Sequence, residues 1–295
     1  MAKIDAFFKL MNEQGASDLH LVAGQPPALR IRGDIERIKY KVLDSDTLRS
    51  MIYEIAPEDK VKKFEETGDI DFGYEIPGLA RYRANFFMQK YGVGAVFREI
   101  PSTVLTAEQL GLPPVMSKLA LLPRGLVLVT GPTGSGKSTT LAAIIDVANK
   151  QRKDHIITVE DPIEFVHQSQ GCIVNHREVG VHTKSFSAAL RGALREDPDI
   201  ILVGEMRDLE TISLAIAAAS TGHLVFGTLH TSSAAKTVDR IIEVFPASEQ
   251  AQIRSTLSDG IRAIIAQVLF KRIDKKGRCP ALEIMIGTPA VRNLI

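Results

Sequence analysis

A glycine-rich loop at Gly131–Ser138 constrains this chain more than any other feature. The loop reads GPTGSGKS, follows the apolar run Leu126–Val129 and precedes a helix-compatible stretch, Thr139–Lys150. A strand, then G-x-x-x-x-G-K-S, then a helix is the arrangement that cradles phosphates. Glycines let consecutive backbone N–H groups turn inward, and the helix N-terminus adds the positive end of its dipole. The sequence therefore predicts a nucleoside triphosphate site.

The residues of this loop have separate predicted roles. Lys137 can reach the β- and γ-phosphates, and the Ser138 hydroxyl group can ligate Mg²⁺. A glycine-rich surface loop without a ligand is the alternative, but it does not explain the lysine. The expected nucleotide contacts are Gly131, Pro132, Thr133, Gly134, Ser135, Gly136, Lys137, Ser138 and Thr139.

Composition and charge narrow the classes of function. The 295 residues carry a formal net charge of +1, which gives no reason to expect non-specific nucleic-acid binding. No apolar stretch is long enough to span a membrane, and residues 1–14 resemble an amphipathic helix rather than a signal peptide, so we expect a cytoplasmic protein. Cys172 and Cys279 form no CxxC pair, so no zinc site is predicted.

The pattern of elements predicts two domains. Residues 1–100 read as an α+β domain in which short helices alternate with hairpin-forming strands. Residues 101–123 contain four prolines and one short helical piece, 107–110, and are expected to form an interdomain linker. From residue 124 to 295, strands alternate with helices, which predicts a parallel α/β sheet.

The second domain is expected to place four strands side by side. They are short apolar runs near 126–130, 155–160, 200–205 and 224–229, as in a sheet covered on both faces. Its tail is predicted to be helical over Ser248–Phe270 and hairpin-like over Pro280–Ile286.

The first of these strands leads into the glycine-rich loop, and each of the other three ends in polar residues. Because ligands bind at the carboxyl edge of such a sheet, we expect the side chains there to converge on the nucleotide. Glu205 ends the third strand, where it could hold Mg²⁺ or polarise the attacking water. The usual aspartate before it is replaced by Gly204. A carboxylate that merely caps the next helix is the alternative.

A second acidic group, Glu160, Asp161 and Glu164, follows the second strand. Three carboxylates this close repel one another unless a cation is near, and Mg²⁺-ATP would supply one. Glu164 is the favoured water-activating base, with a solvated acidic loop as the alternative. His223 and His230 flank the fourth strand. We expect His230 to sense the γ-phosphate with support from His223. A metal pair and purely structural hydrogen bonding are the alternatives.

Several segments together resemble the secretion-ATPase superfamily and, within it, the type IV pilus retraction motors. They cover nearly the whole chain: ASDLHL at 16–21, GPTGSGKST at 131–139, ITVEDPIEF at 157–165, ILVGEMRD at 201–208, TGHLVFGTLHT at 221–231 and AVRNLI at 290–295. The superfamily also carries Gly-Glu where Gly204 and Glu205 stand. The resemblance implies a RecA-like P-loop ATPase domain preceded by a smaller α+β PAS-like domain.

The same resemblance implies how such a chain would work. Members form homohexameric rings that hydrolyse Mg²⁺-ATP, with nucleotide between the two domains of a subunit and its neighbours. Arg81, Arg83 and Arg98 would then contact the phosphates; a solvated strand face is the alternative. ATP turnover would open and close the domains, act on an inner-membrane pilus platform protein and remove pilins.

The resemblance also separates related functions. Assembly motors usually carry a tetracysteine zinc insertion that this sequence lacks, so the retraction branch is favoured over the assembly branch. An accessory retraction motor remains an alternative. Relatives continue beyond AVRNLI, so the C-terminal tail is expected to be truncated. A nucleic-acid motor on the same RecA-like core is disfavoured by the near-neutral charge. A nucleotide-binding regulator without turnover is a weak third possibility.

Overall fold

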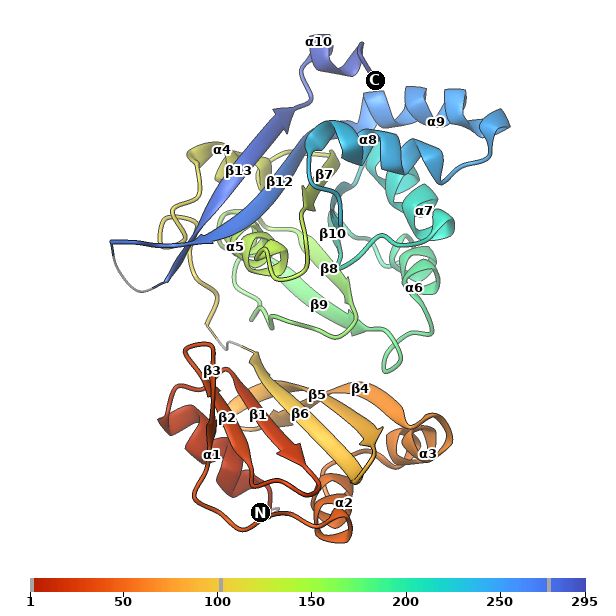
Figure 1. Cartoon of the computed structure of the whole chain (residues 1–295). Coiled ribbons are helices and arrows are strands. Elements are labelled where there is room, and N and C mark those ends of the chain that lie inside the picture. The colour runs from red at the N-terminus through yellow and green to blue at the C-terminus, as the bar shows by residue number, and fades with distance from the viewer. Residues whose placement is uncertain (1–2, 101–102, 275–276) are drawn as a thin grey trace. The chain divides into compact units, whose positions relative to one another are not determined.

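The computed structural model describes residues 3–100, 103–274 and 277–295, which form two compact units divided after Ser102 (Figure 1). Each unit is built around its own sheet and its own buried core. No helix in the described ranges is long and apolar enough to cross a membrane.

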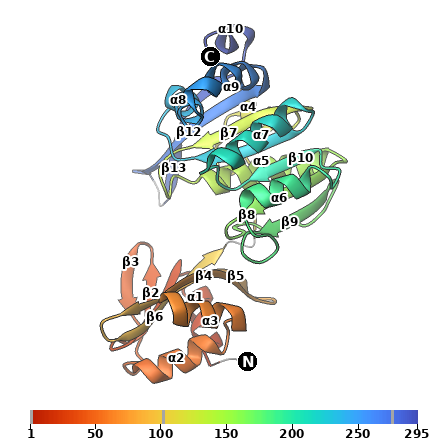
Figure 2. The ribbon, with the colours of Figure 1, turned by 90° about the vertical axis from the view of Figure 1, so that its right-hand side faces the viewer.

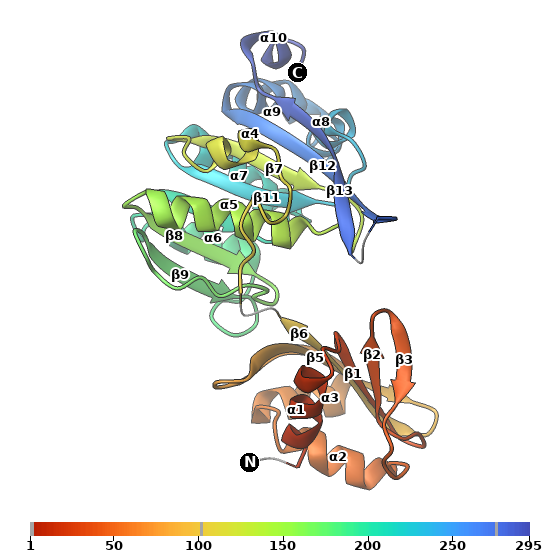
Figure 3. The same cartoon turned by 90° about the vertical axis from the view of Figure 1, so that its left-hand side faces the viewer.

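The first unit packs three helices on one face of a six-stranded antiparallel sheet, in the order β3-β2-β1-β6-β5-β4 (Figure 3). Its core is aromatic: the Phe8 ring centroid lies 4.3 Å from that of Tyr82 and 4.9 Å from that of Phe97. The elements are α1 (Asp5–Glu13), β1 (Asp18–Val22), β2 (Ala28–Ile31), β3 (Asp34–Arg37), α2 (Ser45–Tyr53), α3 (Glu58–Thr67), β4 (Asp69–Ile76), β5 (Ala80–Gln89) and β6 (Gly92–Ile100).

Successive side chains along each strand of this sheet point to opposite faces, one toward the core and one away from it. Tyr82 and Phe97 point into the core, so Arg83 and Arg98, which follow them in sequence, lie on the opposite face. These two arginines stand directly across from each other on β5 and β6. The predicted α+β character of this domain is confirmed.

The second unit is a seven-stranded sheet in the order β13-β12-β7-β11-β10-β8-β9, parallel except for the β12–β13 pair. Its elements are α4 (Pro114–Leu119), β7 (Gly125–Thr130), α5 (Lys137–Gln151), β8 (His155–Glu160), β9 (Ile173–Glu178), α6 (Phe186–Ala193), β10 (Ile200–Val203), α7 (Leu209–Ser220), β11 (Leu224–Leu229), α8 (Ala234–Glu243), α9 (Ala247–Gly260), β12 (Ile261–Lys271), β13 (Arg278–Ile286) and α10 (Pro289–Arg292).

Helices cover both faces of this sheet. Helices α4 and α5 pack on one face (Figure 3), and α6, α7, α8 and α9 pack on the other (Figure 2). Every residue of β7 is buried, as expected of a central strand that faces two helical layers. The predicted parallel α/β architecture of this domain is confirmed.

The segment expected to be a linker contains a packed helix. Residues 101–102 lie outside the described ranges, but Leu112 and Met116 are buried in the same core as α5. Pro113 and Pro114 take the N-cap and first positions of α4, where a proline favours a helix start. The helical piece expected at 107–110 is a turn instead. The described part of the segment therefore packs with the second unit.

The prediction of a helix across Ser248–Phe270 is wrong in its second half. Helix α9 ends at Gly260, and β12 begins at Ile261 and pairs on one side with β7 and on the other with β13. The run Ile261–Lys271 is apolar enough for either a buried helix or a buried strand, and its β-branched residues favour the strand. The polar edge strand β9 was also missed, because its sequence IVNHRE lacks an apolar run.

Candidate functional site

The glycine-rich loop joins β7 to α5 in the backbone conformation that its glycines permit. Gly131, Gly134 and Gly136 have φ values of 144°, 77° and 85°, a region that other residues rarely adopt. Gly136 is the N-cap residue of α5, so the loop leads directly into the helix N-terminus. This geometry places an anion-attracting helix end at the centre of the sheet's carboxyl edge.

Lys137 lies inside the loop. Its Nζ donates to the backbone oxygens of Gly131 at 2.8 Å and Pro132 at 3.1 Å. Burial lowers the pKa of Lys137, while the charges of Glu205 and Glu164 oppose that shift. The two carboxylates predicted for catalysis therefore lie within electrostatic range of the lysine.

Ser138 and Glu160 face a common cavity of about 20 Å³, room for about one water molecule. Gly204 and Thr228 also line it, so the ends of β8, β10 and β11 meet beside the first turn of α5. A Cβ at Gly204 would lie 3.2 Å from Glu160 Cα. The glycine at the predicted aspartate position thus lets β10 and β8 approach closely at their carboxyl ends.

Glu205 contacts two side chains, Arg207 and His230. Its Oε1 lies 2.9 Å from His230 Nε2 and 2.5 Å from Arg207 Nε. Burial alone would raise the pKa of Glu205, but Arg207 and His230 outweigh it and lower that pKa, so the carboxyl group is ionised. The structure therefore brings Glu205 and His230 together, as the strand ends predicted. Arg207 was not predicted as a partner.

The acidic segment after β8 lies at the same edge. The backbone N–H of Glu164 donates to Glu160 Oε2 at 3.1 Å, which holds Glu164 near the loop. Glu164 is partly exposed, whereas Glu160 is buried. Asp161 is exposed, and its charge acts on Arg207. Glu164 as the water-activating base therefore stays a prediction.

Replacing Glu164 with glutamine is expected to slow ATP hydrolysis about a hundredfold while leaving nucleotide affinity within about twofold, because a lost general base costs the chemical step. Steady-state turnover and binding of labelled ADP measure the two effects. Glu243→Gln, an exposed site at the end of α8, is the control. A Glu164→Gln rate equal to that of the control would place the base elsewhere, with Glu205 as the first candidate.

His223 lies far from this site within the unit. It directly precedes β11 at the amino edge of the sheet, where Leu224 pairs with Gly125, whereas His230 follows the other end of the strand. Its Nδ1 lies 3.0 Å from the backbone oxygen of Ala218, at the end of α7. The structure therefore does not support the expected action of His223 through His230, and favours the structural hydrogen-bonding alternative.

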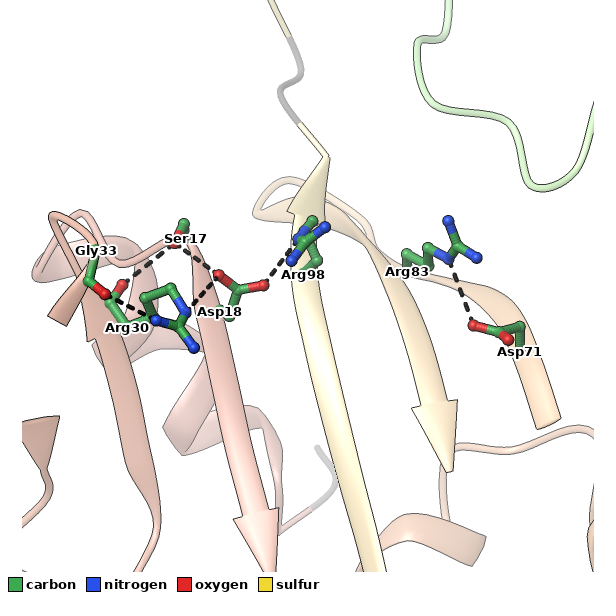
Figure 4. Close-up of polar contacts among 7 residues, drawn as sticks. All are labelled: Ser17, Asp18, Arg30, Gly33, Asp71, Arg83 and Arg98. Carbon is green, nitrogen blue, oxygen red and sulfur yellow. Dashed lines mark hydrogen bonds and ion pairs between the residues drawn. The ribbon is translucent and has the colours of Figure 1, made fainter. Parts of the chain in front are cut away.

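The three predicted arginines belong to the first unit, and each has an acidic partner there. Arg98 Nε lies 2.8 Å from Asp18 Oδ1, and Arg83 Nε lies 3.4 Å from Asp71 Oδ1 (Figure 4). Arg81 Nη1 lies 3.5 Å from Glu75 Oε2. Asp18 also contacts Arg30, at 3.6 Å, so one buried carboxylate serves two arginines. Contact of Arg81, Arg83 and Arg98 with phosphates remains a prediction.

Two histidines beside the site, His167 and His176, were not predicted from the sequence. His176, on β9, lies with its Nδ1 2.8 Å from Thr158 Oγ1 and 3.9 Å from Glu160 Oε1. His167 stacks on it and lines the cavity of Ser138. Burial, aided by His176, lowers the pKa of His167 to about 4, so its ring is neutral at physiological pH. No motif in the sequence signalled this pair.

The donor atoms at the cavity suit Mg²⁺. Ser138 offers a hydroxyl oxygen and Glu160 a carboxylate, and Mg²⁺ is usually held by one or two such protein ligands together with substrate phosphates. Within the described ranges, no three histidine, cysteine, aspartate or glutamate side chains gather as metal ligands. A shared site of protein and phosphate oxygens fits better than a protein cage.

The chain is similar to several known proteins. Residues 82–291 match the family described as "Type II/IV secretion system protein". The chain is 60% identical over 283 residues to the "Type IV pilus retractation ATPase PilT" of Pseudomonas aeruginosa, covering 96% of this chain and 82% of that protein. It is 54% identical over 269 residues to the "Twitching motility protein" of Neisseria gonorrhoeae, covering 91% and 72%.

A solved structure extends the likeness to the whole fold. The crystal structure of the pilus retraction motor PilT with bound ADP superposes with a TM-score of 0.94 at 48% identity. The match covers 100% of this chain and 85% of that one. The prediction of a RecA-like ATPase domain preceded by a smaller N-terminal domain is thereby confirmed.

Proposed function

Because the chain belongs to the family of type II/IV secretion system proteins, we propose that it is an ATP-hydrolysing motor that retracts type IV pili. One observation carries the proposal: a phosphate loop and an ionised Glu205 lie at one sheet edge of a chain 60% identical to a pilus retraction ATPase. The ADP in the structure of a pilus retraction motor supports a nucleotide at this loop.

In this proposal the loop binds the phosphates of ATP and the strand ends perform hydrolysis. Lys137 contacts the β- and γ-phosphates, Glu164 takes the proton of the attacking water, and Glu205 with His230 orients the γ-phosphate end. Ser138 and Glu160 would hold Mg²⁺, with Glu205 in its outer shell, and the ion would neutralise charge on the phosphates. The half-buried Ser138 and the buried Glu160, which line the same cavity, support this assignment.

The wider assembly is proposed from the resemblance to the secretion ATPases. Six copies form a ring, and Arg81, Arg83 and Arg98 of the first domain contact phosphates as the domains close. The exposed guanidinium groups of Arg83 and Arg98 suit such contacts. The ring acts on the pilus platform protein at the cytoplasmic side of the inner membrane and does not act on nucleic acid.

A cell experiment tests the retraction function. We expect expression of the chain to restore twitching and pilus retraction in a Pseudomonas aeruginosa strain that lacks its 60% identical relative, whereas the Lys137→Ala variant restores neither. Retraction events are counted by fluorescence microscopy of labelled pili. A chain that turns over ATP in vitro yet restores no retraction would contradict the proposal.

A measurement in vitro separates this function from a nucleic-acid motor. The purified chain should hydrolyse ATP at a rate unchanged by single-stranded DNA. Salt-sensitive DNA binding with stimulated turnover would instead favour the nucleic-acid motor.

A further inference from the structure

Gln267 on β12 supports the phosphate loop from outside. Its side chain is buried, with 2% exposed, and both ends of its amide group are bonded. Nε2 donates to the backbone oxygen of Ser135 at 2.6 Å, and Oε1 accepts from the Thr140 hydroxyl group at 2.8 Å. One side chain therefore joins the strand to the loop and to the first turn of α5.

The chemistry of the two partners fixes the orientation of the amide group. The backbone oxygen of Ser135 can only accept a hydrogen bond, so the nitrogen of Gln267 must face it. The Thr140 hydroxyl group can donate to the remaining oxygen. A side chain without both a donor and an acceptor would leave at least one buried polar group unpaired.

This contact also sets the direction of a loop N–H group. A trans peptide is planar, and its C=O and N–H bonds point in opposite directions. Because the oxygen of Ser135 is bonded to Gln267 outside the loop, the N–H of Gly136 in the same peptide points away from β12, toward the loop interior. Inward N–H groups are what such a loop uses to bind phosphates.

Backbone and side-chain atoms of β12 both lie close to the glycines of the loop. A Cβ at Gly131 would lie 2.2 Å from the backbone oxygen of Gln267, and a Cβ at Gly136 would lie 3.0 Å from its Nε2 and 3.2 Å from Leu269 Cδ1. Both loop glycines are thus needed for contact with this strand, independently of their φ values.

We propose that Gln267 is a positioning residue for nucleotide binding and hydrolysis: it holds the Ser135–Gly136 peptide and the start of α5 in the phosphate-binding conformation. This inference rests on the proposed ATP hydrolysis at the loop. In this proposal Gln267 acts through Ser135 and Thr140, to which the two ends of its amide group are bonded.

The first test compares two buried or half-buried glutamines of the same unit. Gln267→Leu should weaken binding of labelled ADP and lower turnover, each about tenfold, from the loss of two buried hydrogen bonds. Gln250→Leu is the control, because Gln250 Nε2 donates to the Phe245 backbone oxygen at 3.0 Å, away from the loop. Thermal unfolding of both variants shows whether the fold is kept. Equal affinity and turnover in the two variants would overturn the inference.

A pH series on Gln267→Glu keeps the inference testable even if the leucine variant fails to fold. An ionised glutamate cannot donate to the Ser135 oxygen and repels it, whereas a protonated glutamate donates as the amide does. Burial raises the pKa of such a carboxyl group. The ratio of variant to wild-type turnover should therefore rise several-fold as the pH falls from about 8 to about 6. A ratio that is flat with pH would contradict the inference.

The wild-type protein in the same assays separates this inference from the function on which it rests. If the wild-type chain neither binds ADP nor hydrolyses ATP, the proposed function fails. If it does both and Gln267→Leu matches Gln250→Leu, only the role of Gln267 fails.

Discussion

Replacing Lys137 with alanine is expected to lower ATP turnover about a hundredfold or more and to weaken nucleotide binding. The side chain lies buried in the loop with Nζ beside the Gly131 and Pro132 oxygens, so its charge acts where phosphates would bind with little screening. Removing one preorganised electrostatic group at such a site costs about 10²–10³ in rate. Steady-state turnover and binding of labelled ADP measure the two effects.

Lys150→Ala is the matched control for this change. Lys150 lies on the same helix, pairs with Asp146 at 2.6 Å and is half exposed, so its loss should leave both affinity and turnover within about twofold. If Lys137→Ala behaved like the control, the loop would not be the nucleotide site.

Replacing Glu205 with alanine should lower turnover about a hundredfold or more while ATP still binds. The carboxylate is ionised and is fixed by His230 and Arg207, which makes it suitable for holding the Mg²⁺ shell or the attacking water. Loop contacts to the phosphates do not depend on it. Turnover is measured beside binding of a slowly hydrolysed ATP analogue, so that lost chemistry is distinguished from lost affinity.

Glu210→Ala is the control for Glu205→Ala, because Glu210, in the first turn of α7, forms an exposed ion pair with Arg191 of α6. Turnover of Glu205→Ala close to that of Glu210→Ala would exclude Glu205 from the chemistry. It would also leave Glu164 as the sole acidic candidate among those predicted from the sequence.

The sequence predicted the parts of the site that short motifs encode. The loop, Glu205 and His230 each follow a buried apolar run, and runs of this kind are the strongest signal for central parallel strands. These strands are parallel neighbours, so their carboxyl ends, and the residues that follow them, lie at the same edge of the sheet. The close Glu205–His230 contact was thus within reach of sequence reasoning, although the Arg207 contact was not.

Other parts of the site could not be predicted from local patterns. Whether Ile261–Lys271 is a strand depends on its place between β7 and β13, which only the packed sheet determines. Because β12 was not predicted, the contact of Gln267 with the glycine-rich loop could not be predicted either. His223 and His230 lie at opposite ends of β11, so their closeness in the sequence does not bring their side chains together at one edge of the sheet.

The contact between Ser135 and Gln267 joins residues 132 positions apart in the chain. A ribosome therefore releases the loop sequence long before the strand that shapes it. During synthesis the nascent chain can form β7 and α5, but the loop cannot acquire its support until β12 has left the exit tunnel. Nucleotide binding should thus mature only once β12 has been synthesised, and chains ending before β12 should be poor ATP binders.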